Sequence, residues 1–213
     1  MKRITFVFEV EPGKVQPFIN SAMEQWYIIE GILYRNKIDN FSAWLLGDFV
    51  FCYGEGPDDA DEAKMAEELK SVSEKLKCKG IVALPGEMKL MYHCIGEVQK
   101  RKSLIKHRVF ATHLKPGCAE EYKRRHDALI EARNGVDPDG PESNFTIWCA
   151  KDEFIFGYCE FIKAKMKPET PEEHEATKAW ETKQLEIMDW YTNDVDWLTG
   201  EKHPAARLLY PML

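Results

Sequence analysis

The sequence contains two copies of one residue pattern. Residues 6–13 read F-V-F-E-V-E-P-G, and residues 110–117 read F-A-T-H-L-K-P-G. At the same spacing, Asn40-Phe41-x-x-Trp44 recurs as Asn144-Phe145-x-x-Trp148. After one inserted residue the match continues through aromatic and acidic positions, with Phe49, Phe51, Tyr53 and Glu55 against Phe154, Phe156, Tyr158 and Glu160. A repeat unit of this length can bury a core of its own, so the pattern predicts two tandemly duplicated domains and not a solenoid.

Length and composition fit two small globular domains. The 213 residues allow two domains of about a hundred residues each, a common domain size, and a hydrophobic content of 44% is typical of packed proteins. The net charge of −7 argues against a nucleic-acid partner, because binding phosphates requires a basic surface. The sequence shows no signal-peptide pattern and no apolar run long enough to span a membrane. We therefore expect a cytoplasmic protein without a membrane partner.

The cysteines and histidines give no sign of a metal site. None of the six cysteines belongs to a C-x-x-C pair, and His93, His113, His174 and His203 lack the spacing of metal ligands. We expect free, buried thiols in a reducing compartment, with neither a metal nor a disulfide.

Each copy has the same predicted order of elements. In the first copy, alternating and helical apolar spacing predicts a strand, a helix, a hairpin, a second helix and a last strand, over residues 3–10, 14–34, 41–53, 58–76 and 89–95. In the second copy the same order covers residues 108–114, 118–133, 144–161, 170–197 and 207–210. Thr170-Pro171-Glu172-Glu173 is a typical helix start, and we expect this helix to continue to about Trp197.

The order β-α-β-β-α-β is that of a ferredoxin-like domain, an α+β fold with helices on one face of an antiparallel sheet. We expect two such domains, at residues 1–98 and 104–213, joined by a short linker. Each sheet would leave its other face apolar, so pressing the two sheets together would hide both. The expected architecture is an intrachain pseudo-dimer, an α+β barrel formed within a monomer.

One predicted helix of the second copy carries polar residues that suit proton transfer. Within Tyr122-Lys123-Arg124-Arg125-His126, the first and last residues share a helix face, near apolar positions that should face the sheet. We expect Arg124 and Arg125 to lie on the outer, solvated face. A histidine can exchange protons near neutral pH because its ordinary pKa is about 6.5. The first copy has Phe18 and Ala22 at the positions of Tyr122 and His126, which indicates one functional cavity and one scaffold copy.

The stretch from Arg108 to His126, R-V-F-A-T-H-L-K-P-G-C-A-E-E-Y-K-R-R-H, resembles the N-terminal signature of the L-rhamnose mutarotase family. Asn144-Phe145-x-Ile147-Trp148 and the closing Leu209-Tyr210-Pro211 also resemble segments of that family. The similarity extends over residues 104–213 and, through the repeat, more faintly over residues 1–98, which form a degenerate copy.

The resemblance implies an α+β barrel that interconverts the α and β anomers of a six-carbon aldose, without a cofactor. It implies that His126 donates a proton and that Tyr122 contacts the sugar. The family's strand tyrosine is replaced by Phe145, which implies weaker hydroxyl recognition and favours a deoxy-sugar. The family also has adjacent tryptophans on its second helix. The nearest candidates here are Trp190 and Tyr191, which are the expected sugar-binding aromatic residues, and Trp180 and Trp197 lie nearby in the sequence, so the register stays open.

These observations predict a mutarotase for a small aldose such as L-rhamnose, with His126 and Tyr122 as catalytic residues. Two alternatives remain open on the same fold. One is a different enzyme, such as a cofactor-independent or haem-using monooxygenase, and the other is a sugar-binding or structural domain without catalytic activity.

Overall fold

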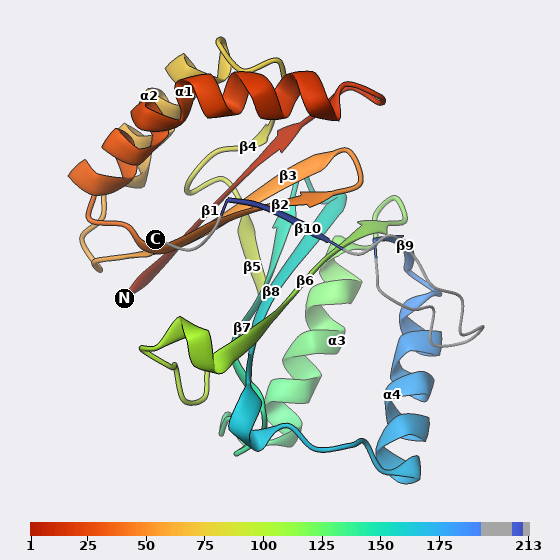
Figure 1. The fold of residues 1–213 in the computed structure, drawn as a ribbon. Helices are drawn as coiled ribbons and strands as arrows, with labels where there is room; N and C mark the ends of the chain where they lie inside the picture. Colours follow the sequence, from red (N-terminus) through yellow and green to blue (C-terminus); the bar gives the residue numbers. More distant parts are fainter. Residues whose placement is uncertain (193–205, 211–213) are drawn as a thin grey trace. The chain divides into compact units, whose positions relative to one another are not determined.

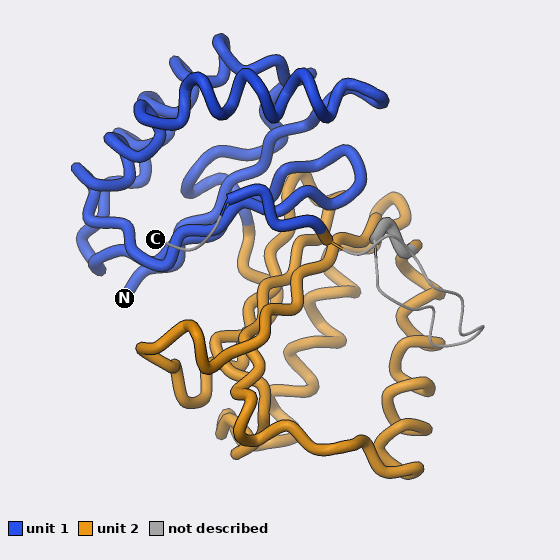
Figure 2. The backbone as a smooth tube through the Cα atoms, in the orientation of Figure 1, with its two compact units in different colours: residues 1–88, 207–213 blue, residues 89–206 orange. Residues whose placement is uncertain are grey.

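The computed structural model describes residues 1–192 and 206–210. The chain divides into two compact units, residues 1–88 with 207–213 and residues 89–206 (Figure 2). Each unit is one five-stranded antiparallel sheet with two α-helices (Figure 1). Within the described ranges, no helix is long and apolar enough to cross a membrane.

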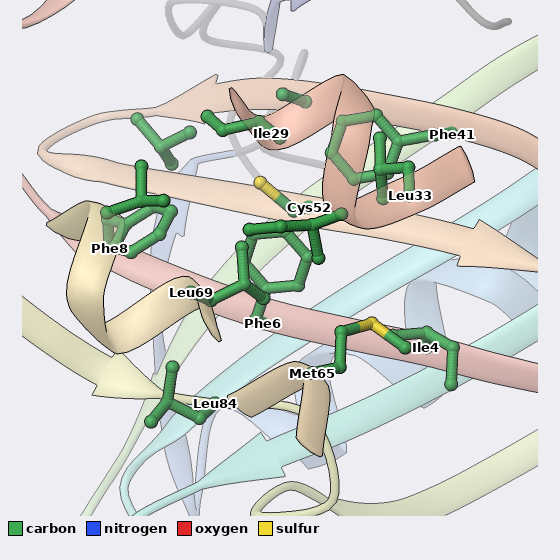
Figure 3. Close-up of a cluster of buried hydrophobic side chains, with 14 of the residues drawn as sticks. Ile4, Phe6, Phe8, Ile29, Leu33, Phe41, Cys52, Met65, Leu69 and Leu84 are labelled. Atoms are coloured by element: carbon green, nitrogen blue, oxygen red, sulfur yellow. The ribbon is translucent and has the colours of Figure 1, made fainter. Parts of the chain in front are cut away.

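The first unit has the sheet order β10-β2-β3-β1-β4. Its elements are β1 (Lys2–Glu9), α1 (Val15–Arg35), β2 (Asp39–Leu46), β3 (Phe49–Gly56), α2 (Glu62–Ser73), β4 (Gly80–Ala83) and β10 (Arg207–Tyr210). Alternate residues of the strands pack against apolar faces of both helices, as expected for a sheet with one helix-covered face. Figure 3 shows this core, in which Phe6 and Cys52 from the sheet lie among Leu33, Met65 and Leu69 from the helices.

The second unit has the sheet order β5-β7-β8-β6-β9. Its strands are β5 (Lys89–Cys94), β6 (Ile105–Leu114), β7 (Glu142–Ala150), β8 (Phe154–Ile162) and β9 (Met188–Thr192). Its helices are α3 (Ala119–Ala132) and α4 (Pro171–Gln184), with short 3₁₀ turns at Lys102–Leu104 and Lys163–Lys165. The predicted start of α4 is confirmed, because Thr170 and Glu173 form a reciprocal capping box.

The α+β class and the two ferredoxin-like halves are confirmed. The strand that completes each ferredoxin-like half is not the predicted one. It is β4 in the first half, paired with β1, and β9 in the second half, paired with β6, and neither strand was predicted from the sequence. The strand β5 instead extends the second sheet beside β7, and β10 extends the first sheet beside β2. Each half therefore gives its final strand to the other sheet.

The helix expected to run to Trp197 ends at Gln184, so the prediction of its length is wrong. The backbone N–H of Ile187 bonds to the carbonyl of Gln184, and the N–H of Lys115 then bonds to the carbonyl of Ile187. That second bond starts the pairing of β9 with β6. Residues 187–192 are rich in β-branched and aromatic side chains, which favour this strand over continued helix. Trp197 lies outside the described residues.

The repeated residues build the same buried hydrogen-bond cluster in each unit. In the first unit, the Asn40 amide and the Tyr53 hydroxyl donate to Glu55 Oε1 over 3.0 and 3.1 Å. In the second unit, their counterparts Asn144, Tyr158 and Glu160 form the same bonds, at 3.1 and 2.9 Å. Asn40 and Asn144 also share a positive φ of 48° and 49°, which asparagine tolerates better than most residues. These constraints explain why the sequence pattern is the same in both halves.

Candidate active site

A cavity of about 500 Å³ lies in the second unit between α3, α4 and the helix-covered face of the sheet. Residues of β6 alternate between the two faces, so Arg108, Phe110 and Thr112 all face the helices. Thr177, Trp180, Glu181 and Gln184 recur at helical spacing on one face of α4. Together with Tyr122 and His126 of α3, these side chains make a cavity that is aromatic in its walls and polar at several points.

His126 is buried, with 5% of its surface exposed, and its ring is fixed by the backbone. Its Nδ1 lies 2.9 Å from the carbonyl oxygen of Tyr122. A carbonyl only accepts hydrogen bonds, so Nδ1 carries the ring proton and Nε2 keeps its lone pair. Nε2 has no hydrogen-bond partner among the described residues.

Burial lowers the pKa of His126 to about 4, although the bond to the Tyr122 carbonyl opposes this shift. This pKa lies well below the ordinary histidine value of about 6.5, because a desolvated imidazolium is costly. At neutral pH the ring is neutral, and Nε2 is a proton acceptor.

The rings of Tyr122 and His126 are in contact, with centroids 4.2 Å apart and planes tilted by 32°. Burial, together with the nearby charge of Glu181, raises the pKa of its phenol above the ordinary value. The hydroxyl therefore stays protonated and serves as a hydrogen-bond donor. The rings of Tyr92 and Trp180 meet His126 edge-on, each at 5.4 Å, and hold the imidazole from two further sides.

Two acidic side chains, Glu142 and Glu181, line the cavity together with Arg108. Burial raises the pKa values of Glu142 and Glu181, and the positive charge of Arg108 opposes both shifts. Arg133 also opposes the shift at Glu142, and its guanidinium donates to the Tyr92 hydroxyl over 2.9 Å. The cavity therefore contains carboxyl groups that keep their protons to a higher pH than ordinary glutamates do.

The structure brings together His126, Tyr122 and Phe145, three of the five residues expected from the sequence. Phe145 is half-buried and meets Tyr92 edge-on at 5.3 Å. Trp190 and Tyr191, expected on the second helix, lie instead in strand β9. Their side chains are outside the described part of the structure, so their expected sugar contacts stay a prediction.

Sequence reasoning missed much of the polar lining. Arg108 and Glu142 lie in strands, where a charged residue ordinarily indicates a solvent-facing position. Glu181 and Gln184 could have been found from their spacing with Thr177 on the well-capped helix α4.

Arg125 was expected on the solvated face of its helix and is instead 8% exposed. It donates to Glu121, to the carbonyl of Lys183 and to Glu186, so it ties α3 to the end of α4. Arg124 is exposed as expected and pairs with Glu121.

The first unit holds a cavity of about 350 Å³ of different character. Phe18 and Ala22 line it at the positions that correspond to Tyr122 and His126, and its other walls are apolar or aromatic. Within the described residues of both units, no group of three or more His, Cys, Asp or Glu side chains is arranged to hold a metal ion.

Comparison with known proteins supports the resemblance seen in the second half. Residues 107–206 match the family model described as L-rhamnose mutarotase. Among solved structures, the crystal structure of an anthrone oxidase-like protein is similar to this chain at a TM-score of 0.47 and 12% identity. That match covers 97% of this chain and 92% of the other. A search among curated proteins finds no match. Over residues 107–206, the second half of the chain is therefore similar to the L-rhamnose mutarotase family.

Proposed function

We propose that the second unit is a mutarotase, which interconverts the α and β anomers of an aldose in the cavity beside His126. The observation that carries this proposal is a buried histidine in the lining of the cavity, whose Nδ1 is bonded to the Tyr122 carbonyl and whose Nε2 is left to act on a ligand. Mutarotation requires one group that takes a proton and one that gives a proton.

His126 suits the first role. Its Nε2 takes the proton of the anomeric hydroxyl while the bond between C1 and the ring oxygen breaks. The anomeric carbon becomes an aldehyde carbon, and the ring oxygen must receive a proton. His126 is then positively charged in a buried site, so returning the proton is favourable. In this scheme His126 is a base during ring opening and the proton donor during ring closure, which reconciles its low pKa with the donor role that the family implies.

Glu181 suits the second role. Burial raises its pKa, which favours the protonated form that could give a proton to the ring oxygen. Glu181 follows Trp180 in α4, and the Trp180 ring contacts His126. In its ionised form Glu181 also raises the pKa of the Tyr122 phenol, so the two groups lie within electrostatic range of each other. After ring opening, rotation about the bond between C1 and C2 presents the other face of the aldehyde. The same two proton transfers in reverse then give the other anomer.

The aromatic side chains give the site its affinity for a sugar. Phe110, Phe145 and Trp180 offer flat faces and edges to the C–H groups of a pyranose, and the Tyr122 hydroxyl offers a hydrogen bond. Such rings also reduce the water around the reacting groups, which strengthens the electrostatic interactions inside the cavity.

Saturation-transfer NMR tests this proposal on a panel of free aldoses, with the protein at catalytic concentration. Faster exchange between the α and β anomeric resonances of at least one sugar is the expected result. Sugar binding without faster exchange of any panel member would contradict the mutarotase and favour a sugar-binding domain.

A further inference from the structure

The first unit contains a cavity of about 350 Å³ that the proposed mutarotase chemistry does not use. It lies between α1 and the helix-covered face of the sheet, and Phe6, Phe8 and Phe41 of the strands line it together with Ile29 of the helix (Figure 3). Ala22 also lines it, at the position that His126 has in the second unit. The two copies therefore keep a cavity at corresponding places and line it with different chemistry.

A series of touching aromatic rings forms part of the cavity wall. Phe6 meets Phe8 edge-on with ring centroids 5.6 Å apart, and it stacks with Phe41 at 5.9 Å. The Trp26 ring lies between Phe41 and Tyr210, with centroid distances of 5.9 and 3.8 Å. Aromatic rings attract the edges and faces of other aromatic rings beyond the effect of buried area. The wall therefore favours an aromatic ligand over an aliphatic ligand of the same size.

The nitrogen and oxygen donors of the wall side chains are already paired. Among the described residues that line the cavity, Trp26 and Tyr210 are the ones with a side-chain nitrogen or oxygen. Trp26 Nε1 donates to Glu30 Oε1 over 3.0 Å, and the Tyr210 hydroxyl donates to the same oxygen over 2.6 Å. No charged side chain is part of the described lining. A sugar or an ionised group would therefore lose its water here without replacement.

The size of the cavity limits the ligand. An apolar cavity of about 150 Å³ can hold benzene and stays free of water, because a buried water molecule needs about two to four polar partners. The first-unit cavity has roughly twice that volume, which fits two fused rings. Met23, which is 73% exposed, lines the cavity beside the half-buried Ala22. The cavity therefore reaches the surface along α1, where a ligand can enter.

We propose that the first unit binds a small neutral molecule with two fused aromatic rings in this cavity. Contact with the rings of Trp26 and Phe41 stabilises the ligand, and release of water from both apolar surfaces drives binding. Side chains around an empty apolar cavity lack contacts on one side, so the ligand also stabilises the fold of the first unit. The described lining shares no residue with the His126 cavity, and the site does not depend on the mutarotase activity.

Naphthalene is the probe, because it has two fused rings and no hydrogen-bonding group. Saturation-transfer NMR on the full chain measures its binding. Naphthalene-1,5-disulfonate is the charged counterpart, and its two charges lie on opposite sides, so a buried ring system cannot keep both in water. We expect saturable binding of naphthalene and at least about 10-fold weaker binding of the disulfonate. No saturable binding of naphthalene, or equal affinity for both probes, overturns the proposal.

Variants assign the binding to the first unit. Ala22→Phe adds a ring beside the cavity, and Ala22→Leu adds a smaller apolar side chain. We expect Ala22→Phe to weaken naphthalene binding about 10-fold or more, and Ala22→Leu to weaken it less, because each reduces the apolar surface left for the ligand. Ala63→Phe, at an exposed position of α2, is the matched control and binds as the wild type does. Wild-type affinity in both Ala22 variants would overturn the site.

Thermal unfolding gives a second readout. Naphthalene should raise the Tm of the wild type and of Ala63→Phe, because it binds the folded state, and should raise the Tm of Ala22→Phe less. An equal rise in all three proteins would show that the probe binds elsewhere and would overturn the proposal. Anomer exchange enters neither readout, so failure of this site leaves the mutarotase in place, and absence of exchange leaves this site in place.

Discussion

His126 Nδ1 lies 2.9 Å from the carbonyl oxygen of Tyr122, one turn earlier in α3. This bond fixes the tautomer, so the lone pair of the imidazole is on Nε2. Burial lowers the pKa of the ring to about 4, and the ring is therefore neutral at neutral pH. The one residue thus combines a fixed orientation with an available proton acceptor.

The low pKa of His126 predicts a loss of stability in mild acid. An unfolded histidine binds its proton near pH 6.5, whereas the folded one binds it only near pH 4. The contribution of His126 to the free energy of unfolding is therefore complete above pH 6.5 and is lost as the pH falls through 4. Its size is roughly 3 kcal/mol.

Urea denaturation at pH 7 and at pH 4 checks this prediction. His126→Asn lacks the titrating group, while the groups at Glu142 and Glu181 are common to both proteins. Between pH 7 and pH 4 the wild type should therefore lose up to roughly 3 kcal/mol more unfolding free energy than the variant loses. A difference that does not change with pH would show that the ring is not held neutral by burial.

Glu181→Gln should slow anomer exchange while leaving sugar binding nearly unchanged. Glutamine has the same shape and keeps hydrogen bonding, but it cannot give a proton to the ring oxygen. We expect a fall in exchange rate of about 100-fold or more. Glu172→Gln, on the exposed first turn of α4, is the control. Wild-type exchange by Glu181→Gln would remove Glu181 from the mechanism.

Phe145→Tyr should strengthen sugar binding. Phe145 is part of the cavity wall, so a hydroxyl on its ring would restore a contact that the family resemblance implies. One hydrogen bond between neutral groups contributes about 0.5–1.5 kcal/mol, or roughly a 2- to 10-fold lower dissociation constant. Titration by ligand-observed NMR measures it. Unchanged or weaker binding of every sugar would show that the ring does not face the ligand's hydroxyls.

Sugar should bind once per chain. In the first unit, Phe18 and Ala22 replace Tyr122 and His126, and the surrounding cavity wall is apolar or aromatic. Such a wall cannot satisfy the hydroxyl groups of a sugar, so desolvating them there would be unfavourable. Calorimetric titration should therefore give a stoichiometry of one. Two equivalent sites per chain would contradict the assignment of the site to the second unit alone.

The parts of the fold that depend on local pattern could be predicted, and those that depend on distant partners could not. Strand alternation and the repeated Asn-Tyr-Glu positions predicted both ferredoxin-like halves. Alternation alone does not show which neighbour a strand selects, so the exchange of β5 and β10 was missed. The short β9 was also missed, because its approach through Leu185 and Ile187 continues a helical apolar spacing.

The candidate site also contains residues that local sequence pattern predicted and residues that it could not predict. Tyr122 and His126 were found because their spacing places both on one helix face, next to apolar residues. Glu142 and Arg108 were missed because their roles depend on the cavity that they line with α3 and α4, which their own strands do not reveal. The low pKa of His126 depends on burial, to which distant residues such as Tyr92 and Trp180 contribute their rings.

The most direct measurement is the rate of anomer exchange by saturation-transfer NMR for the wild type, His126→Asn and His174→Asn. His174 is exposed on α4, so its replacement controls for the loss of a histidine. Asparagine at position 126 keeps a hydrogen-bonding side chain but cannot take up and return a proton near neutral pH. We predict exchange at the wild-type rate for His174→Asn and only the uncatalysed rate for a folded His126→Asn. Exchange at the wild-type rate by His126→Asn would contradict the account.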